Sequence, residues 1–399
     1  MTSSRTKLLL VGVGLMGQPY LAAARRLGLQ VRAVEGAARA AGIADRLDGL
    51  HVARGELDEL WAEGAWAAAV ADRPDGVLAF TEWNVLGAAL LQDRLGLPGP
   101  SLHAAVVSRN KALQRGLFAS AGVRQPDYVV VDGLAAAADW VAGRLPVVVK
   151  PLSSAGSAGV ELVATRAAFT EVAARRAGER SLLVETAVQG PEYSWEALIH
   201  DGAVWLSNTT AKETTEAPYF VEVAHRTGAA LGAKVAAQVD ELGAQVIGAL
   251  GMRTGVVHLE FRLATDGPTV MEVAVRTPGD HLMELLGLTY GIDWFEALAR
   301  LTMSLPLPEA PAGPVAFAAS YFPSAPTGVV TEVAGLDAVL AHPAVVRAEL
   351  TKQPGEVVAP TALGADRVGY VLLAADRPEK IEEALTFVRR SLVVRTAAA

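Results

Sequence analysis

"VVVKPLSSAGSAGV", residues 147–160, joins a strand-like apolar run to a loop of small residues. The run ends at Lys150, and the loop from Ser153 to Gly159 follows almost at once. Small side chains let backbone N–H groups approach phosphate oxygens closely, and a lysine adds a positive charge beside them. The pattern is typical of a phosphate-binding loop, although a solvated lysine before an ordinary surface loop would look the same.

Acidic side chains in the strands that follow add to this pattern. In "VVHLEFRL", alternation places His258, Glu260 and Arg262 on one face of a strand and leaves Leu259 and Phe261 for the core. By the same alternation, Glu272 in "VMEVAVR" is expected to point away from its neighbours Met271 and Val273. Two carboxylates on adjacent strands favour a Mg²⁺ ion that bridges phosphates. The alternative is that each acid is a solvent-facing position of an amphipathic strand.

Composition limits the class of protein. A chain of 399 residues is long for one core and predicts two or three domains. A net charge of -8 argues against a nucleic-acid groove. With no cysteine, disulfides, thiolate metal sites and a cysteine nucleophile are excluded. The N-terminal apolar run is short, broken by glycines and lacks a cleavage site, so a cytoplasmic protein is expected.

The order of predicted elements indicates an α/β protein. Short strands and Ala/Leu-rich helices alternate from Lys7 to about Pro98, which predicts a doubly wound parallel sheet. Longer strands follow Pro151 and predict an antiparallel sheet flanked by helices over 234–250 and 281–305. Pro/Gly-rich linkers at 96–101 and 305–314 suggest boundaries. The predicted domains are 1–100, 101–305 with a lid part at about 151–190, and 306–399.

A second glycine-rich segment, "LLLVGVGLMGQPYLAAARRLGLQVRAVE" at 8–35, points to a different ligand. Gly12, Gly14 and Gly17 have the GxGxxG spacing of a dinucleotide-binding turn, and Glu35 lies where an acid would bind a ribose. An NAD-dependent dehydrogenase is therefore an alternative interpretation of this sequence. Glycines in such a turn also permit close packing of strand and helix without any ligand.

The charged residues in the middle of the chain resemble, in order and spacing, those of the ATP-grasp superfamily of carboxylate–amine ligases. The residues that carry this resemblance are Lys111, Lys150 with the loop after it, Glu185, Glu192, Glu260, Glu272 and Arg276. The resemblance covers nearly the whole chain. It implies an α/β fold of ATP-grasp architecture, with an N-terminal Rossmann-like domain, a two-part α+β ATP-binding centre and a small C-terminal α+β domain. Against the dehydrogenase reading, the glycine turn of such a preceding domain need hold no NAD.

The resemblance also implies roles for single residues. Lys111 and Lys150 match the phosphate-contacting lysines, and Arg276 matches the catalytic arginine that steadies the phosphoryl group. Glu260 and Glu272 match the magnesium ligands, but where many relatives have Asn this chain has Ala274, which puts a second metal ion in question. The implied ATP-binding set is Lys111, Lys150, Ser153, Ser154, Gly156, Ser157, Gly159, Glu185, Val188 and Glu192, with Glu185 and the backbone after it at the adenine and Glu192 at the ribose.

Within the superfamily the chain looks most like L-amino acid ligases, which form dipeptides. Glu222 and His225 in "FVEVAH" and Arg276 and Gly279 in "RTPGDH" resemble their substrate-binding positions. Glu82 in "AFTEWN" falls where a formate-dependent glycinamide ribonucleotide transformylase has a substrate-binding acid, and that enzyme is the alternative within the superfamily. A nucleotide-binding regulatory protein without catalysis is a further alternative, which the intact Lys/Glu/Arg set opposes.

The implied reaction is ATP-dependent amide or peptide bond formation through an acyl phosphate, with ATP and Mg²⁺ as cofactors. The expected partners are a small-molecule carboxylate and an amine. Neither nucleic acid nor membrane is expected as a partner, and a homodimer is a candidate assembly.

Overall fold

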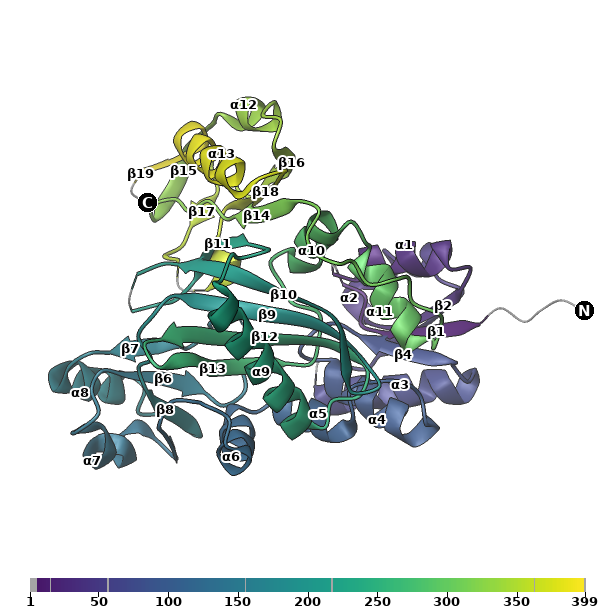
Figure 1. Ribbon diagram of the computed structural model, residues 1–399, viewed down its shortest axis with the longest axis horizontal. Coiled ribbons are helices and arrows are strands. Elements are labelled where there is room, and N and C mark those ends of the chain that lie inside the picture. The colour runs from purple at the N-terminus through teal and green to yellow at the C-terminus, as the bar shows by residue number, and fades with distance from the viewer. Residues whose placement is uncertain are drawn as a thin grey trace, which may run out of the picture.

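The computed structural model describes residues 6–14, 16–55, 57–154, 156–216, 218–361 and 363–397. A large central sheet lies in the middle of the molecule, with the N-terminal elements at one end and the C-terminal elements above it (Figure 1). The helices are α1 (Gln18–Arg26), α2 (Ala37–Ala40), α3 (Asp58–Ala71), α4 (Val85–Leu95), α5 (Leu102–Ser108), α6 (Lys111–Ala121), α7 (Ala138–Val141), α8 (Arg166–Arg175), α9 (Ala233–Leu250), α10 (Leu282–Tyr290), α11 (Trp294–Thr302), α12 (Leu336–Leu340) and α13 (Pro378–Ser391).

The N-terminal sheet is parallel, as predicted. Its strand order is β3-β2-β1-β4, and each neighbouring pair runs in the same direction. The residues of β1 are buried on both faces except at its start, as expected for a strand covered by helices on both sides. The strands are β1 (Lys7–Val11), β2 (Gln30–Gly36), β3 (Gly49–Ala53) and β4 (Gly76–Ala79).

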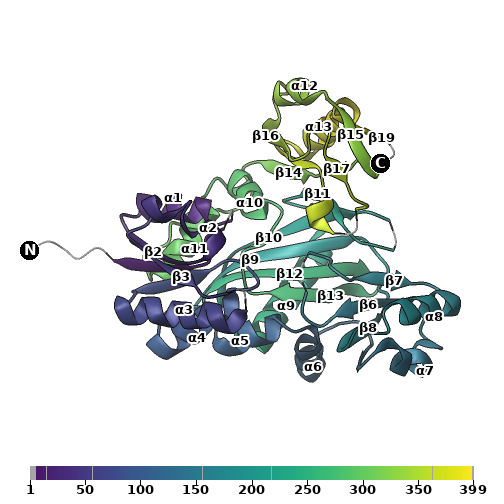
Figure 2. The same ribbon diagram turned by 180° about the vertical axis from the view of Figure 1, so that it is seen from behind.

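A small antiparallel sheet lies beside the central one, in the order β5-β8-β6-β7 (Figures 1 and 2). Its apolar face packs on α8 through Phe169 and Val172. The expected lid part, about 151–190, covers only some of this sheet, because β5 and β6 belong to it as well. The strands are β5 (Tyr128–Val131), β6 (Val147–Pro151), β7 (Glu161–Val163) and β8 (Leu182–Thr186).

The central sheet is antiparallel and has the strand order β13-β12-β9-β10-β11-β14-β18-β16. Helix α9 covers one face, where Val239 and Leu242 join the core around Trp195. Strands from the C-terminal part of the chain continue this sheet, so the division at residue 305 stays a prediction. The strands are β9 (Glu192–His200), β10 (Ala203–Thr214), β11 (Glu222–Arg226), β12 (Gly255–Ala264), β13 (Gly267–Ala274), β14 (Phe317–Tyr321), β16 (Val345–Leu350) and β18 (Gly369–Ala375).

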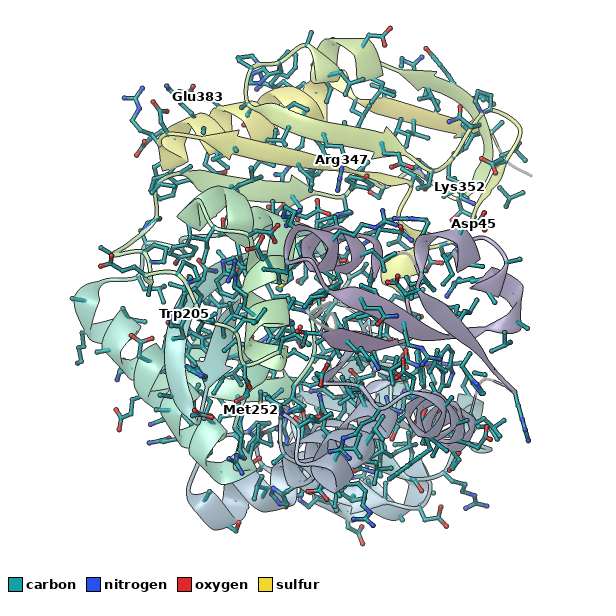
Figure 3. All side chains as sticks on the ribbon, turned by 90° about the vertical axis from the view of Figure 1, so that its right-hand side faces the viewer. Asp45, Trp205, Met252, Arg347, Lys352 and Glu383 are labelled. Atoms are coloured by element: carbon teal, nitrogen blue, oxygen red, sulfur yellow. The ribbon has the colours of Figure 1, made fainter. Side chains whose placement is uncertain are left out.

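A short C-terminal sheet, β17-β15-β19, completes the fold. Figure 3 views the molecule from the side of the N-terminal sheet, and Arg347 of β16 lies on the lower side of the C-terminal elements, where it pairs with Glu284 of α10. The strands are β15 (Gly328–Ala334), β17 (Val357–Val358) and β19 (Val393–Ala397).

One predicted helix is wrong. The segment 281–305 forms two helices, α10 and α11, because the chain turns between them. Gly291 ends α10 in the left-handed conformation, at φ 69°, and the Asp293 carboxylate caps α11 by accepting a hydrogen bond from the N–H of Glu296. Gly291 and Asp293 are both signals of a helix boundary in the sequence, but the continuous apolar pattern across them suggested a single helix.

Candidate nucleotide and metal site

One pocket lies between the small sheet and the central sheet and collects most of the predicted site residues. The lining residues come from strands β6, β7 and β9–β13, from helix α6, from the loops after β6, β8 and β10, and from the turn after β13. The predicted residues in its wall are Lys111, Lys150, Ser154, Gly156, Ser157, Val188, Glu192, Glu222, Glu260, Glu272 and Arg276. Six predicted residues are not in this wall: Glu82, Ser153, Gly159, Glu185, His225 and Gly279.

The two predicted metal ligands face each other. Glu260 of β12 pairs in register with Glu272 of β13, and both line the pocket. The register then shifts, so that Phe261 pairs with Val270 and Met271 becomes the extra residue of a β-bulge. Met271 therefore lines the pocket beside Glu272, and the expectation from simple alternation that it points the other way is wrong.

Lys111 reaches the pocket from the first turn of α6. The Asn110 side chain caps this helix by accepting hydrogen bonds from the N–H groups of Ala112 and Leu113. From this fixed start, the Lys111 ammonium pairs with the Glu272 carboxylate at 2.9 Å and donates to the Ser154 carbonyl, also at 2.9 Å. Lys111 thus connects the start of α6 to the expected metal ligand Glu272 and to Ser154 of the small-residue loop.

Lys150 is held from behind by Glu185. The Glu185 carboxylate has no exposed surface and pairs with Lys150 at 2.7 Å and with Arg115 at 2.6 Å. Burial would raise the pKa of Glu185, but the two cations outweigh burial and lower the pKa to about 2. Glu185 lies behind the pocket wall, and the residues that follow it, Ala187 and Val188, are the ones that line the pocket.

Lys212 of β10 was not among the predicted residues, yet it is the centre of the acidic side of the pocket. Its ammonium lies 2.6 Å from Glu260, 2.9 Å from Glu192 and 3.2 Å from Glu222. Burial lowers the pKa of Lys212, but the three carboxylates outweigh burial and hold the pKa well above its ordinary value. Only the hairpin register, which sets Lys212 opposite Glu192, brings this lysine to the acids.

His258 supports Glu260 from the same strand. Its Nδ1 lies 3.0 Å from the fully buried Glu196 and its Nε2 lies 3.5 Å from Glu260. Burial lowers the pKa of His258, but the two carboxylates raise it to about 9. The alternating face of His258, Glu260 and Arg262 is confirmed, since all three line the pocket while Leu259 and Phe261 are buried in the core.

The loop over the pocket is held by a second loop. Ser157 donates from its hydroxyl to the Phe220 carbonyl, and the Phe220 ring lies under the Arg262 guanidinium, 5.0 Å from ring centre to Cζ. Arg262 in turn pairs with Glu192 at 2.9 Å. Ala155, within the predicted loop, lies outside the described residues.

Arg276 connects the pocket to the N-terminal part of the chain. Its Nε donates to the Glu82 carboxylate at 2.8 Å, and Glu82 also pairs with Arg109 at 3.3 Å. Burial raises the pKa of Glu82, but Arg276 and Arg109 outweigh it and lower the pKa. Glu82 therefore acts on the pocket through Arg276, outside the pocket wall itself.

His225 of β11 and Gly279 of the turn after β13 lie outside this pocket wall. His225 is buried, and its Nε2 lies 2.9 Å from Asp280, whose carboxylate also pairs with Arg367 of the C-terminal part. Burial raises the pKa of Asp280, but His225 and Arg367 outweigh it and lower the pKa. Gly279 is exposed in this turn. No sequence pattern pointed to Arg367, which comes from a distant segment of the chain.

The glycine turn of the N-terminal sheet is already satisfied from within. The Glu35 carboxylate accepts hydrogen bonds from the N–H groups of Val13, Gly14 and Gly36, each at 2.8 Å. A Cβ on Gly17 would come within 2.4 Å of the Val13 carbonyl oxygen, so this glycine is needed for packing. Because Glu35 uses the N–H groups that a pyrophosphate would need, the turn does not favour a dinucleotide.

The donor set of the pocket fits a single Mg²⁺ that also binds phosphate. The described residues hold no cluster of three or more His, Cys, Asp or Glu side chains suited to a metal. Glu260 and Glu272 alone supply carboxylates from facing positions, and Mg²⁺ commonly takes one or two carboxylates and completes its shell with phosphate and water oxygens. Ala274, also in the wall, adds no oxygen ligand from its side chain.

Among the described helices, none has the length and apolar character needed to cross a bilayer.

Sequence families match two parts of the chain. Residues 143–283 match the ATP-grasp domain, and residues 320–397 match L-amino acid ligase C-terminal domain 2. The chain is 27% identical over 370 residues to the uncharacterised protein y4rH of Sinorhizobium fredii, covering 90% of this chain and 76% of that protein. It is 28% identical over 344 residues to carnosine synthase 1 of Gallus gallus, covering 76% of this chain but only 36% of that protein.

Solved structures share the fold over nearly the full length. An L-amino acid ligase from Bacillus licheniformis has a TM-score of 0.86 at 23% identity and covers 99% of this chain and 100% of its own. An N5-carboxyaminoimidazole ribonucleotide synthetase from Thermotoga maritima has a TM-score of 0.74 at 17% identity and covers 98% and 100%. The two family matches therefore identify an ATP-grasp domain and an L-amino acid ligase C-terminal domain in this chain, and its fold over nearly the full length is that of the L-amino acid ligase structure.

Proposed function

We propose that the protein uses ATP and Mg²⁺ to join an amino acid, or another small carboxylate, to an amine through an acyl phosphate. The observation that supports this most is the facing pair Glu260 and Glu272, in a pocket that also receives Lys111, Lys150 and Arg276. The similarity to L-amino acid ligases supports amino acids as the first substrates to test.

The charges in the pocket match the demands of such a reaction. A carboxylate that attacks the terminal phosphate of ATP brings two anions together, so cations must offset the charge on the transferring group. In the proposed arrangement Lys111 and Lys150 contact phosphate oxygens and Arg276 contacts the group being transferred. Mg²⁺ held by Glu260 and Glu272 would add charge neutralisation. Glu192 and the backbone at Val188 would hold the ribose and the adenine.

The present ion pairs suggest how the pocket accepts a charged nucleotide. Lys111 is paired with Glu272, and Arg276 is paired with Glu82. When nucleotide and metal bind, Lys111 can exchange Glu272 for a phosphate oxygen while Glu272 turns to the metal. Each charged contact is replaced by another, so neither charge is left buried without a partner.

Water must be kept from an acyl phosphate, which it would hydrolyse. The loop with Ser154, Gly156 and Ser157 is placed to do this, because Ser157 already contacts the Phe220 loop across the pocket. Ser153 and Gly159 flank this part of the loop. On the substrate side, Glu222 lies in the pocket, whereas Glu82, His225 and Gly279 would act through Arg276 and Asp280.

An ADP-release screen of amino-acid pairs with ATP and Mg²⁺, followed by mass spectrometry of the products, tests this proposal. We expect ADP and a condensed product in equal amounts for at least one pair. Glu272→Gln should abolish both, whereas Glu332→Gln, a strand carboxylate paired with Arg395 on the surface, should not. ADP release without any condensed product, for every pair tried, would refute the ligase function.

A further inference from the structure

A second cavity lies at the glycine turn, outside the nucleotide pocket, and shares no lining residue with it among the described residues. It has a volume of about 340 Å³, within the range of small-molecule sites. Gly12 and Glu35, which line it, lie at the carboxyl ends of β1 and β2. This edge of an open parallel sheet is where such folds usually bind ligands.

The cavity offers hydrogen-bond donors from side chains. Arg39 is exposed, and no carboxylate of the described residues lies within 4.0 Å of its guanidinium. Asn84 is only 4% exposed, and its amide NH₂ has no hydrogen-bond partner among the described residues, while its oxygen accepts from the Thr81 hydroxyl. A buried donor without a partner is costly, so an acceptor from a ligand is expected here. The Glu35 charge does not oppose an anion strongly, because three backbone N–H groups bind that carboxylate.

The cavity also offers flat apolar surface. Trp61 is nearly buried in its wall, whereas Trp83 is 53% exposed. Arg109 lies over the Trp83 ring, 5.2 Å from the ring centre to Cζ, which steadies the indole. A large aromatic ring held in place at the mouth of a cavity, with much of its surface in water, is well suited to stack on a planar group.

We propose that this cavity binds a small carboxylate that carries an aromatic or other planar apolar group. The carboxylate pairs with Arg39 and accepts from the Asn84 amide, and the planar group packs on Trp83 and Trp61. Glu82, between Thr81 and Trp83 in the chain, pairs with Arg276 of the nucleotide pocket. A ligand that packs on Trp83 would therefore contact the residue next to Glu82, which is the ion-pair partner of Arg276.

Two sources could supply this chemistry: a substrate of the ligase reaction, or an effector that is not consumed. The substrate assignment rests on the proposed function, whereas binding at the cavity does not. A ligase substrate would appear in the condensed product. An effector would change the rate of ADP release and be recovered intact.

Titration calorimetry with 3-phenylpropionate tests the site, with phenethylamine as the cationic control of similar size. We expect the carboxylate to bind and the amine to bind much more weakly. Arg39→Gln should weaken carboxylate binding at least about tenfold, and Trp83→Ala several-fold. The matched controls are Arg54→Gln, an exposed arginine directly after β3, and Trp140→Ala, another tryptophan under an arginine. Both controls should bind like the wild type.

The proposal would be overturned by equal affinity of Arg39→Gln and the wild type, by equal binding of amine and carboxylate, or by no binding at millimolar concentration. Melting temperatures of the four variants check that each is folded. Binding by Glu272→Gln, which should not turn over, separates the two proposals: the cavity can bind its ligand even where the ligase function fails.

Discussion

Two regions of this chain combine a glycine-rich turn with a nearby acid, and they differ in what the acid does. At the N-terminal turn, Glu35 accepts from three backbone N–H groups of its own domain. In the central pocket, Glu260 and Glu272 are paired with Lys212 and Lys111, which come from other elements. In the first arrangement the acid is fully hydrogen-bonded by backbone N–H groups of its own domain. In the second, the lysines can bind the phosphates of a nucleotide and the carboxylates can bind a metal ion.

The difference shows why spacing alone identifies a nucleotide site poorly. The GxGxxG turn has the spacing of a dinucleotide site, but the N–H groups of Val13 and Gly14 already bind Glu35. The central loop has a less specific sequence, yet it borders a pocket whose cations and carboxylates come from six strands and a helix. What distinguishes the two is the availability of partners in three dimensions. The predictions below test that distinction.

Replacing an acid of the central pocket should affect chemistry far more than stability. For Glu272→Ala we expect turnover to be abolished, a fall of at least about a thousandfold, because the proposed metal ion loses one of its two carboxylates. The unfolding free energy should fall by a smaller amount, about 1–2 kcal/mol, because the buried Lys111 loses this ion pair but keeps its hydrogen bond to the Ser154 carbonyl. ADP release and urea unfolding measure the two effects. Turnover like that of the wild type would remove Glu272 from the metal site.

Glu185, the buried acid behind the pocket wall, should instead affect how the unfolding free energy changes at acidic pH. The folded-state pKa of Glu185, about 2, is below its ordinary value of 4.5. Its contribution is therefore complete above about pH 4.5 and is lost as the pH falls toward 2, a change of about 3 kcal/mol. Urea midpoints measured across this range should show a loss that Glu185→Gln largely lacks. A parallel profile for both proteins would contradict the assignment.

Removing the acid of the N-terminal turn should affect stability and spare the nucleotide pocket. Glu35→Ala leaves the N–H groups of Val13, Gly14 and Gly36 without their acceptor, which should cost about 2 kcal/mol, with water replacing part of the loss. ATP binding should be unchanged. Tight binding of NADH to the wild-type protein, seen by calorimetry, would show that the turn does hold a dinucleotide.

The smallest expected effect concerns Arg276. Arg276→Lys keeps the charge but loses the planar fork that can contact carboxylate and phosphate together. Turnover should fall at least about tenfold, or about 1.4 kcal/mol, with much less change in ATP affinity because Lys111 and Lys150 remain. If the only defect were weaker ATP binding, the assigned role at the transferring group would be wrong.

Local patterns predicted the parts of the fold and site that depend on neighbours in the chain. The parallel N-terminal sheet, the antiparallel central sheet and the shared face of His258, Glu260 and Arg262 all follow from periodicity. The superfamily resemblance added the family and the list of residues. Eleven of the proposed residues lie in one pocket wall.

Contacts between segments that are distant in the chain could not be predicted from the sequence. Lys212 is recognisable only once the β9–β10 register is known, and Arg367 only once the C-terminal elements are placed on β11. Met271 faces the pocket because of a bulge, which simple alternation cannot predict. Glu185 was expected at the adenine, but its burial between Lys150 and Arg115 depends on how α6 packs on the small sheet.

The continuity of the central sheet has a practical consequence for anyone who shortens this chain. The L-amino acid ligase domain match begins at residue 320, inside β14, and β14 pairs with β11 through Ala224, His225 and Arg226. Truncation at this family boundary would cut a strand in two and bare the edge of β11. Unprotected edges of this kind promote aggregation. A fragment that ends before β14 should therefore be poorly soluble, even though every residue of the nucleotide pocket would still be present.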